Sequence, residues 1–221
     1  MSDPLSPPPL PCIAVVDDDQ ALRESLAWLL ESVGLATQAY ADGETFLATR
    51  TATIDAVLLD VRMPGLSGLQ VHQQLHDEGI TLPVIIMTGH GDVPMAITAL
   101  KGGAFDFIEK PFNPQQLIDT VQQALNLHQR ERLAQSQLAA LQARYRSLRP
   151  KEQLIILHVA QGMTSREIAA HIGVSGKTVE VYRLRAMKTM GAANLAQLVR
   201  QAVALELVAC LPDQAPGFTE R

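Results

Sequence analysis

Five side chains in the first half of the chain have the types and positions needed to bind a metal ion and a phosphoryl group. Each ends or follows a short apolar run of the kind that forms a buried strand. If these runs are neighbouring parallel strands, their carboxyl ends meet at one edge of the sheet, where open α/β sheets bind ligands. The side chains are Asp17, Asp18, Asp60, Thr88 and Lys110.

These side chains together suit phosphoryl transfer. The adjacent carboxylates after the first run repel one another unless a cation neutralises them, and carboxylate oxygens suit Mg²⁺. Mg²⁺ and the Lys110 ammonium would attract a phosphoryl group to Asp60, whose carboxylate can act as a nucleophile and become an acyl phosphate. The Thr88 hydroxyl could donate to a phosphoryl oxygen. Each residue alone has an ordinary explanation, because Asp60 or Thr88 can cap a helix and Lys110 can be a surface charge.

The residues between these strand ends predict alternating strands and helices. Short apolar runs predict strands, and segments with one apolar face predict helices. This alternation implies an α/β fold with a doubly wound, five-stranded parallel sheet. The predicted strands are residues 13–16, 35–40, 56–60, 83–88 and 104–109, and the predicted helices are 23–33, 43–49, 69–76, 93–101 and 114–127.

The charge of the chain is divided between its two halves. Residues 12–127 hold 5 basic and 15 acidic residues, a net charge of −10, whereas residues 128–147 carry +3 and residues 148–211 carry +4. This division indicates separate functions, with an anionic partner for the second half.

The two ends of the chain predict tails. Residues 1–11 contain five prolines and lack the basic start and apolar core of a signal peptide, so they are expected to be a disordered tail. Residues 212–221 are expected to form a second tail. No window approaches the roughly 20 apolar residues of a membrane span. With no export signal, Cys12 and Cys210 are expected to be reduced thiols in the cytoplasm.

Residues 128–147 predict a helical linker. They contain no Gly or Pro and are rich in Gln, Arg, Ala and Leu, which are good helix formers. Apolar residues recur there at spacings of seven, three and four, which is compatible with a short coiled-coil seam between two molecules. A single helix packed on its own domain is the alternative, and both remain open.

Residues 148–211 predict a small helical domain. A capping box at Thr164 and Glu167 opens a short helix, Gly173 makes a turn, and Ser175 can cap the next helix. Helix, Gly-containing turn and helix indicate a helix-turn-helix motif. Arg149 stands where Ser or Thr would cap better, at a cost of about 1 kcal/mol. The four predicted helices are residues 150–161, 165–171, 176–190 and 193–208.

The third of these helices has a face suited to DNA. Cations there can contact phosphates, and a few side chains can contact base edges. Arg166, at the start of the preceding helix, also suits a DNA phosphate. A solvated charged face is the alternative. The candidate DNA-binding residues are Arg166, Lys177, Thr178, Glu180, Val181, Leu184, Arg185 and Lys188.

The first half resembles the receiver domain of two-component response regulators, which has a flavodoxin-like fold. The resemblance covers residues 13–127, and the mutual spacing of its motifs matches. The matching segments are Val16-Asp17-Asp18-Asp19, Leu59-Asp60-Val61-Arg62-Met63-Pro64-Gly65, Met87-Thr88-Gly89-His90-Gly91-Asp92 and Ile108-Glu109-Lys110-Pro111-Phe112.

This resemblance implies a role for each site residue. Asp60 would accept the phosphoryl group from a histidine kinase, with Thr88 and Lys110 holding its oxygens. Asp18 and Asp60 would bind Mg²⁺ directly, and Asp17 would bind it through water. The backbone carbonyl of Arg62 would be a further ligand, Phe107 would be the aromatic switch, and Lys110-Pro111 would be a cis peptide. Phosphorylation would promote pairing of two molecules through helix 93–101, strand 104–109 and helix 114–127.

Residues 148–208 resemble the LuxR/FixJ-type DNA-binding domain. The resemblance rests on residues 161–169 and on residues 172–175 and 178–181, and Glu180 fits the FixJ-like branch. Arg149 and Tyr182 depart from the family pattern, where a Thr or Ser cap and a His are usual. The two resemblances imply a transcription regulator with a sensor histidine kinase, promoter DNA and RNA polymerase as partners.

Other classes of protein fit the sequence less well. A Mg²⁺-dependent phosphohydrolase with an Asp nucleophile is the main alternative, but haloacid-dehalogenase-type phosphatases need a second Asp two residues later, and Arg62 stands there. A nucleotide-binding enzyme would need a G-x-x-x-x-G-K-[ST] or G-x-G-x-x-G motif, which the sequence lacks. A receiver that works without phosphorylation is a further alternative.

Overall fold

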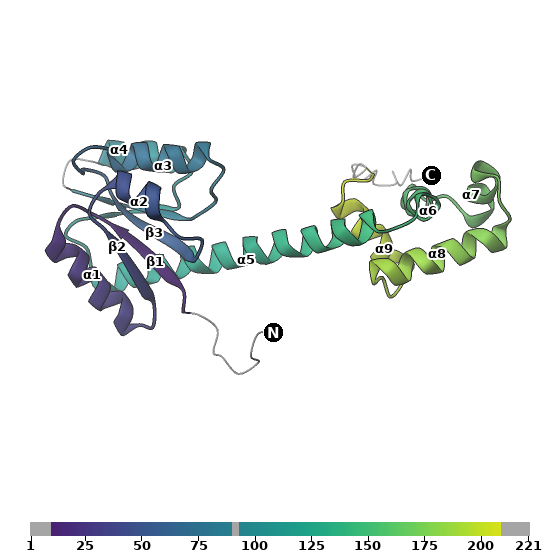
Figure 1. The fold of residues 1–221 in the computed structure, drawn as a ribbon, viewed down its shortest axis with the longest axis horizontal. Helices are drawn as coiled ribbons and strands as arrows, with labels where there is room; N and C mark the ends of the chain where they lie inside the picture. Colours follow the sequence, from purple (N-terminus) through teal and green to yellow (C-terminus); the bar gives the residue numbers. More distant parts are fainter. Residues whose placement is uncertain (1–9, 90–92, 209–221) are drawn as a thin grey trace, which may run out of the picture. The chain divides into compact units, whose positions relative to one another are not determined.

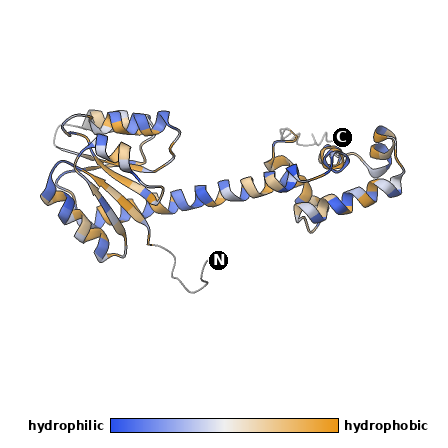
Figure 2. Ribbon diagram, in the orientation of Figure 1, coloured by the Kyte–Doolittle hydropathy of each residue, from blue (hydrophilic) through white to orange (hydrophobic). Residues whose placement is uncertain are grey.

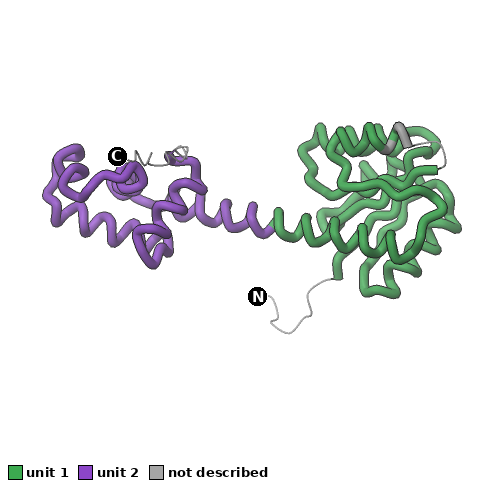
Figure 3. The backbone as a smooth tube through the Cα atoms, turned by 180° about the vertical axis from the view of Figure 1, so that it is seen from behind, with its two compact units in different colours: residues 1–132 green, residues 133–221 purple. Residues whose placement is uncertain are grey.

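The computed structural model describes residues 10–89 and 93–208. The chain divides into two compact units, residues 1–132 and residues 133–221 (Figure 3). No helix in the described part of the chain is long and apolar enough to cross a membrane. Cys12 is a buried free thiol, whereas Cys210, His90 and nearly all of both predicted tails lie outside the described residues.

Unit 1 contains the predicted five-stranded parallel sheet. Its strands lie in the order β2-β1-β3-β4-β5, which confirms the doubly wound α/β fold. β1 and β3 are buried along most of their length because helices cover both faces of the sheet. The strands are β1 (Cys12–Val16), β2 (Ala36–Tyr40), β3 (Ile54–Asp60), β4 (Val84–Thr88) and β5 (Asp106–Glu109).

Two apolar clusters hold the helices of unit 1 against the sheet. One cluster joins Phe46, Val71 and Ala99 to one face, and the other joins Leu26 and Val121 to the opposite face. Figures 1 and 2 show the largely apolar strands between helices that carry both polar and apolar residues. The helices are α1 (Gln20–Ser32), α2 (Gly43–Thr49), α3 (Gly68–Asp77), α4 (Val93–Lys101) and α5 (Pro114–Arg146).

Local hydrogen bonds explain where α1 and α5 differ from the predicted ranges. α1 begins before residue 23 because the Asp19 carboxylate accepts hydrogen bonds from the backbone N–H groups of Ala21 and Leu22. α5 does not end at Leu127. It continues to Arg146 because the predicted linker contains no helix breaker. The linker is therefore helical as predicted, while the coiled-coil seam stays a prediction.

Unit 2 contains the predicted helix-turn-helix. Its core includes Ile156, Ile168, Val179 and Leu198, and Gly173 ends α7 in the left-handed conformation at φ 68°. The helices are α6 (Pro150–Ala160), α7 (Ser165–Ile172), α8 (Gly176–Met190) and α9 (Leu195–Ala204). α9 is shorter than predicted at both ends. The Asn194 side chain caps its first turn by accepting from the backbone N–H of Gln197, and the helix ends at Ala204, before Glu206 with its positive φ of 56°.

The unusual cap residue of α6 is compensated by a neighbour. Arg149 makes no side-chain cap, but its backbone N–H donates to the carboxylate of Glu152 at 3.0 Å. One half of a capping box is therefore present, and the expected cost of the missing hydroxyl is reduced accordingly.

Candidate functional site

The parallel register brings four of the predicted site residues to one edge of the sheet. Asp17 follows the last residue of β1, Asp60 ends β3, Thr88 ends β4 and Lys110 follows β5. Because Val16 is aligned with Leu59, Asp60 with Met87 and Thr88 with Glu109, the four residues fall within two positions of one another at the carboxyl ends of neighbouring strands. Asp17, Asp60 and Thr88 are 1%, 6% and 0% exposed. The four residues therefore lie at one edge of the sheet, and their roles there stay a prediction.

The ammonium of Lys110 joins the two buried carboxylates. Its Nζ donates to Asp17 Oδ2 at 2.6 Å and to Asp60 Oδ1 at 2.5 Å. The backbone N–H of Lys110 donates to the Thr88 carbonyl at 2.6 Å, which fixes the start of the side chain. Lys110-Pro111 is a cis peptide, as the resemblance implied.

The two carboxylate oxygens of Asp60 have different partners. Oδ1 accepts from Lys110, and Oδ2 accepts from the backbone N–H of Arg62 at 2.8 Å. This second bond turns the loop after β3 back over the carboxylate, so Arg62 contacts the site through its backbone. The arrangement leaves Asp60 held at both oxygens and aimed at the edge where a substrate would bind.

The charges at this edge are strongly coupled. Burial raises the pKa of the Asp60 carboxyl, and the charge of Asp17 adds to this, while Lys110 opposes it. Burial lowers the pKa of the Lys110 ammonium, but the hydrogen bonds and charges of Asp17 and Asp60 outweigh that effect and raise it. Lys110 therefore stays a cation at neutral pH, ready to neutralise an anionic group bound beside Asp60.

Thr88 and Phe107 lie where the resemblance implies a switch. The Thr88 hydroxyl is buried and has no hydrogen-bond partner among the described residues. An unpaired buried hydroxyl costs about 1–3 kcal/mol, so an incoming acceptor oxygen would stabilise it. Phe107 is half-buried, on β5, and packs against the apolar cluster that lies under α2, α3 and α4.

The oxygen donors at the site fit Mg²⁺ by type. Asp17 and Asp60 offer carboxylates, the Arg62 backbone offers a carbonyl, and Asp18 is exposed beside them in the chain. Within residues 10–89 and 93–208, however, no three Asp, Glu, His or Cys side chains are gathered closely enough to hold an ion by themselves. Lys110 lies between Asp17 and Asp60 instead, so the Asp18 side chain would have to join them.

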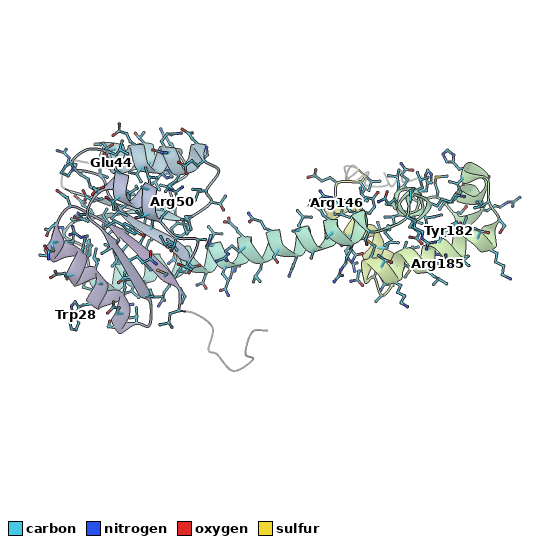
Figure 4. All side chains as sticks on the ribbon, viewed as in Figure 1. Trp28, Glu44, Arg50, Arg146, Tyr182 and Arg185 are labelled. Atoms are coloured by element: carbon cyan, nitrogen blue, oxygen red, sulfur yellow. The ribbon has the colours of Figure 1, made fainter. Side chains whose placement is uncertain are left out.

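Three residues that the sequence analysis did not single out support the site. The Arg23 guanidinium donates to the Asp17 carbonyl at 2.6 Å. Glu44, on α2 and labelled in Figure 4, accepts from the backbone N–H of Leu66 at 3.0 Å and so holds the loop after β3. A Cβ on Gly68 would lie 2.1 Å from the Asp60 carbonyl oxygen. Of these three residues, only Gly68 could have been recognised from the sequence, because it ends the Pro- and Gly-containing turn after Asp60.

Most of the side chains predicted to contact DNA are exposed on α8 of unit 2, and their role stays a prediction. Lys177, Val181, Leu184, Arg185 and Lys188 are exposed, and Leu184 is 62% exposed although it is apolar. Figure 4 labels Arg185 on this helix. Arg166 is exposed at the start of α7. These five exposed residues of α8 are spaced by three and four positions, which places them on one face of that helix.

Three further residues of α8 are engaged within unit 2. The Thr178 hydroxyl lies 2.8 Å from that of Ser175. Glu180 is half-buried and bonded to other side chains of the unit. Tyr182, where the family usually has His, is half-buried and packs on the core. The departure at Tyr182 is thus accommodated by packing.

Each of the two units matches a known protein family. Residues 13–122 match the family described as "Response regulator receiver domain". Residues 146–202 match the family described as "Bacterial regulatory proteins, luxR family".

Curated relatives match over nearly their whole length. Nodulation protein W of Bradyrhizobium diazoefficiens is 40% identical over 203 residues, which are 91% of this chain and 89% of that protein. Transcriptional regulatory protein FixJ of Azorhizobium caulinodans is 41% identical over 205 residues, which are 92% of this chain and 97% of that protein.

Solved structures show the same architecture. The response regulator StyR has a TM-score of 0.80 at 35% identity and covers 88% of this chain and 99% of its own. Full-length FixJ from B. japonicum has a TM-score of 0.56 at 36% identity and covers 90% of this chain and 98% of its own.

Proposed function

Because this chain belongs to the two-component transcriptional response regulators that join a receiver domain to a LuxR-family DNA-binding domain, we propose that a phosphoryl group on Asp60 switches its binding to promoter DNA. The observation that carries this proposal is the shared contact of Lys110 with the buried carboxylates of Asp17 and Asp60. This contact supports the proposal, because an acyl phosphate on Asp60 would need a cation beside it.

In this proposal the histidine kinase supplies a phosphohistidine, and an Asp60 carboxylate oxygen attacks its phosphorus. The new O–P bond forms as the P–N bond of phosphohistidine breaks, and the imidazole leaves. Receiver domains typically use Mg²⁺, which here would neutralise the phosphoryl oxygens. Asp18, Asp60 and the Arg62 carbonyl would bind it directly, and Asp17 through water. Lys110 turns from Asp60 Oδ1 to a phosphoryl oxygen, and Thr88 donates to another.

The proposed conformational switch depends on the buried Thr88 hydroxyl, which has no hydrogen-bond partner among the described residues. A phosphoryl oxygen would accept a hydrogen bond from Thr88, so phosphorylation favours the conformer in which Thr88 moves towards it. Phe107 turns into the space that Thr88 leaves. The face formed by α4, β5 and α5 changes shape and pairs with the same face of a second molecule. Ile97 and Leu127, which are 46% and 43% exposed, are apolar side chains on these helices.

We further propose that residues 12–127 act as the phosphoryl acceptor, residues 128–147 as the linker and residues 148–211 as the DNA-binding domain. Two paired copies would read a two-fold symmetric site through α8, with Lys and Arg on phosphates and Val181 and Leu184 near base edges. RNA polymerase is a further proposed partner, and the cytoplasm is the proposed location. The family is one of transcription regulators, and this favours a regulator over the phosphohydrolase alternative.

The proposal is tested with the full chain, Mg²⁺ and acetyl phosphate as a small phosphoryl donor. Intact mass should show a single added phosphoryl group in the wild type and none in Asp60→Asn. Asp55→Asn is the matched control, because Asp55 lies on the same strand and pairs with Arg132 instead. Phosphorylation of Asp60→Asn at the wild-type rate would refute the assignment.

Dimerisation and DNA binding are tested next. Sedimentation with beryllofluoride, which mimics an acyl phosphate, should convert the wild type to dimer and leave Asp60→Asn unchanged. Selection of duplexes from a random library should then yield a two-fold symmetric site for the activated wild type. If the activated chain binds no DNA, the DNA-binding part of the proposal is wrong.

A further inference from the structure

The cationic side chain of Arg183 on α8 is paired with other side chains of unit 2. The Arg183 guanidinium pairs with the Glu180 carboxylate one turn earlier, with Nη2 donating to Oε2. The other carboxylate oxygen, Oε1, accepts from the Ser165 hydroxyl at 2.7 Å, and Arg183 Nη1 reaches the same hydroxyl at 3.4 Å. These three side chains, here called the α7–α8 network, join the first residue of α7 to α8.

The α7–α8 network lies beside the proposed DNA-facing side of α8. The side chains of Glu180 and Arg183 are 43% and 29% exposed, so both reach solvent. Glu180 is three residues after Lys177 and four before Leu184, spacings that place it next to both on the helix surface. A DNA phosphate approaching this flank would therefore meet an Arg that a carboxylate already neutralises.

A hydroxyl and a guanidinium are common donors to DNA phosphates. In the α7–α8 network the Glu180 carboxylate occupies both donors, and its oxygens have the same need for N–H and O–H groups as phosphate oxygens. Glu180 is thus placed to compete with DNA for Arg183 and Ser165. Electrostatic contacts with phosphates carry no sequence information. Competition by Glu180 therefore lowers the affinity for all sequences alike, unless contact with a particular base breaks the Glu180–Arg183 pair.

We propose that Glu180 determines specificity by withholding Arg183 from phosphates in non-specific complexes and releasing it in the specific complex. There Glu180 accepts a hydrogen bond from the exocyclic amine of a cytosine or adenine in the major groove, and Arg183 moves to a phosphate. Where a guanine or a thymine stands at that position, the carboxylate meets only acceptors, so the pair stays closed. This inference rests on the proposed DNA-binding function of α8.

The test measures how affinity falls with salt for the beryllofluoride-activated full chain, on a random duplex and on the selected duplex. Each phosphate contact adds about 0.9 to the slope of log affinity against log salt. Glu180→Gln should steepen the random-duplex slope by about 0.9, which means about three- to fourfold more loss of affinity between roughly 0.05 and 0.2 M salt. The ratio of selected to random affinity should fall.

Arg183→Ala separates the gating from a simple change of charge. In the wild-type background it should leave the random-duplex slope unchanged, and in the Glu180→Gln background it should remove the added 0.9 or so. Glu206→Gln is the matched control, because Glu206 is exposed in the same unit and lies outside the α7–α8 network. It should leave the slope and the affinity ratio unchanged.

The outcomes separate this inference from the function on which it rests. If Arg183→Ala lowers the random-duplex slope equally in both backgrounds, Arg183 already contacts DNA and Glu180 gates nothing. An affinity ratio that Glu180→Gln does not change would also overturn the inference. Loss of all DNA binding by the activated wild type would instead contradict the proposed function. Thermal unfolding of each variant shows that the compared chains are folded.

Discussion

Gly68 should be essential for both the stability and the reactivity of the Asp60 site. A Cβ at this position would lie 2.1 Å from the Asp60 carbonyl oxygen, 2.9 Å from its carbonyl carbon and 3.2 Å from Leu59 Cγ. Two of these atoms are backbone, so no side-chain rotation relieves the clash. Restoring an ordinary contact requires the end of β3 or the start of α3 to move by about 1 Å, and overpacking of this kind costs about 1–3 kcal/mol.

The same displacement should slow phosphorylation. Asp60 is held by Lys110 and by the Arg62 backbone, and the Gly68 backbone N–H donates to the Val61 carbonyl in the same loop. Misplacement of a reacting group by about 1 Å can reduce a rate by about 100-fold. Gly68→Ala should therefore lower the free energy of unfolding by about 1–3 kcal/mol, so that the variant unfolds at a lower urea concentration. It should also accept a phosphoryl group from acetyl phosphate at least about tenfold more slowly.

The assay combines urea unfolding with the rate of phosphoryl incorporation followed by intact mass. Gly176→Ala is the control for the Gly-to-Ala change itself, because a Cβ there meets nothing within 4 Å. It should leave the phosphorylation rate unchanged and stabilise α8 by about 0.5–1 kcal/mol. Wild-type stability together with a wild-type rate in Gly68→Ala would refute the argument that this close approach positions Asp60.

Three further predictions concern the charges and hydroxyls of unit 1. Lys110→Gln leaves two buried carboxylates without their shared cation, so the free energy of unfolding should fall by about 3–5 kcal/mol. Urea unfolding should show Mg²⁺ restoring more stability to the variant than to the wild type; an equal Mg²⁺ effect would contradict the site. Thr88→Val removes an unpaired buried hydroxyl, so unfolding should show no loss of stability, while sedimentation should show that beryllofluoride no longer drives dimerisation. Burial lowers the pKa values of His72 and His128, helped by His76 at the first and by Arg132 at the second. The unfolded chain binds these protons more readily near pH 6.5, so stability should be full above about pH 6.5 and fall as the pH drops below it; urea unfolding from pH 7.5 to 5.5 should show this fall, and His72→Phe with His128→Phe should reduce it.

Several features of the fold could be predicted from the sequence because their causes are local. The buried strands are short apolar runs, the Thr164–Glu167 capping box begins α7, and Gly173 supplies the left-handed residue between α7 and α8. The convergence of Asp17, Asp60, Thr88 and Lys110 was also predictable. It follows from a general rule, since carboxyl ends of parallel strands meet at one edge.

Other features depended on which side chains approach in space. The sequence indicated an oxygen-rich site for Mg²⁺, but only the tertiary structure placed the Lys110 ammonium between Asp17 and Asp60. These residues are separated by 93 and 50 positions, and such pairing depends on sheet register and side-chain reach. The support from Arg23 and Glu44 is equally invisible in the sequence. The turn after Asp60 points to Gly68, but only the structure shows the clash that demands it.

The same division holds in unit 2. Helical spacing by itself placed Lys177, Glu180 and Leu184 on one face of α8, because residues three and four apart are neighbours on any α-helix. Whether Glu180 faces DNA freely or is held by Ser165 and Arg183 was decided by the packing of α7 on α8. Periodicity therefore determines which residues share a surface, and tertiary packing determines which of their charges are already paired.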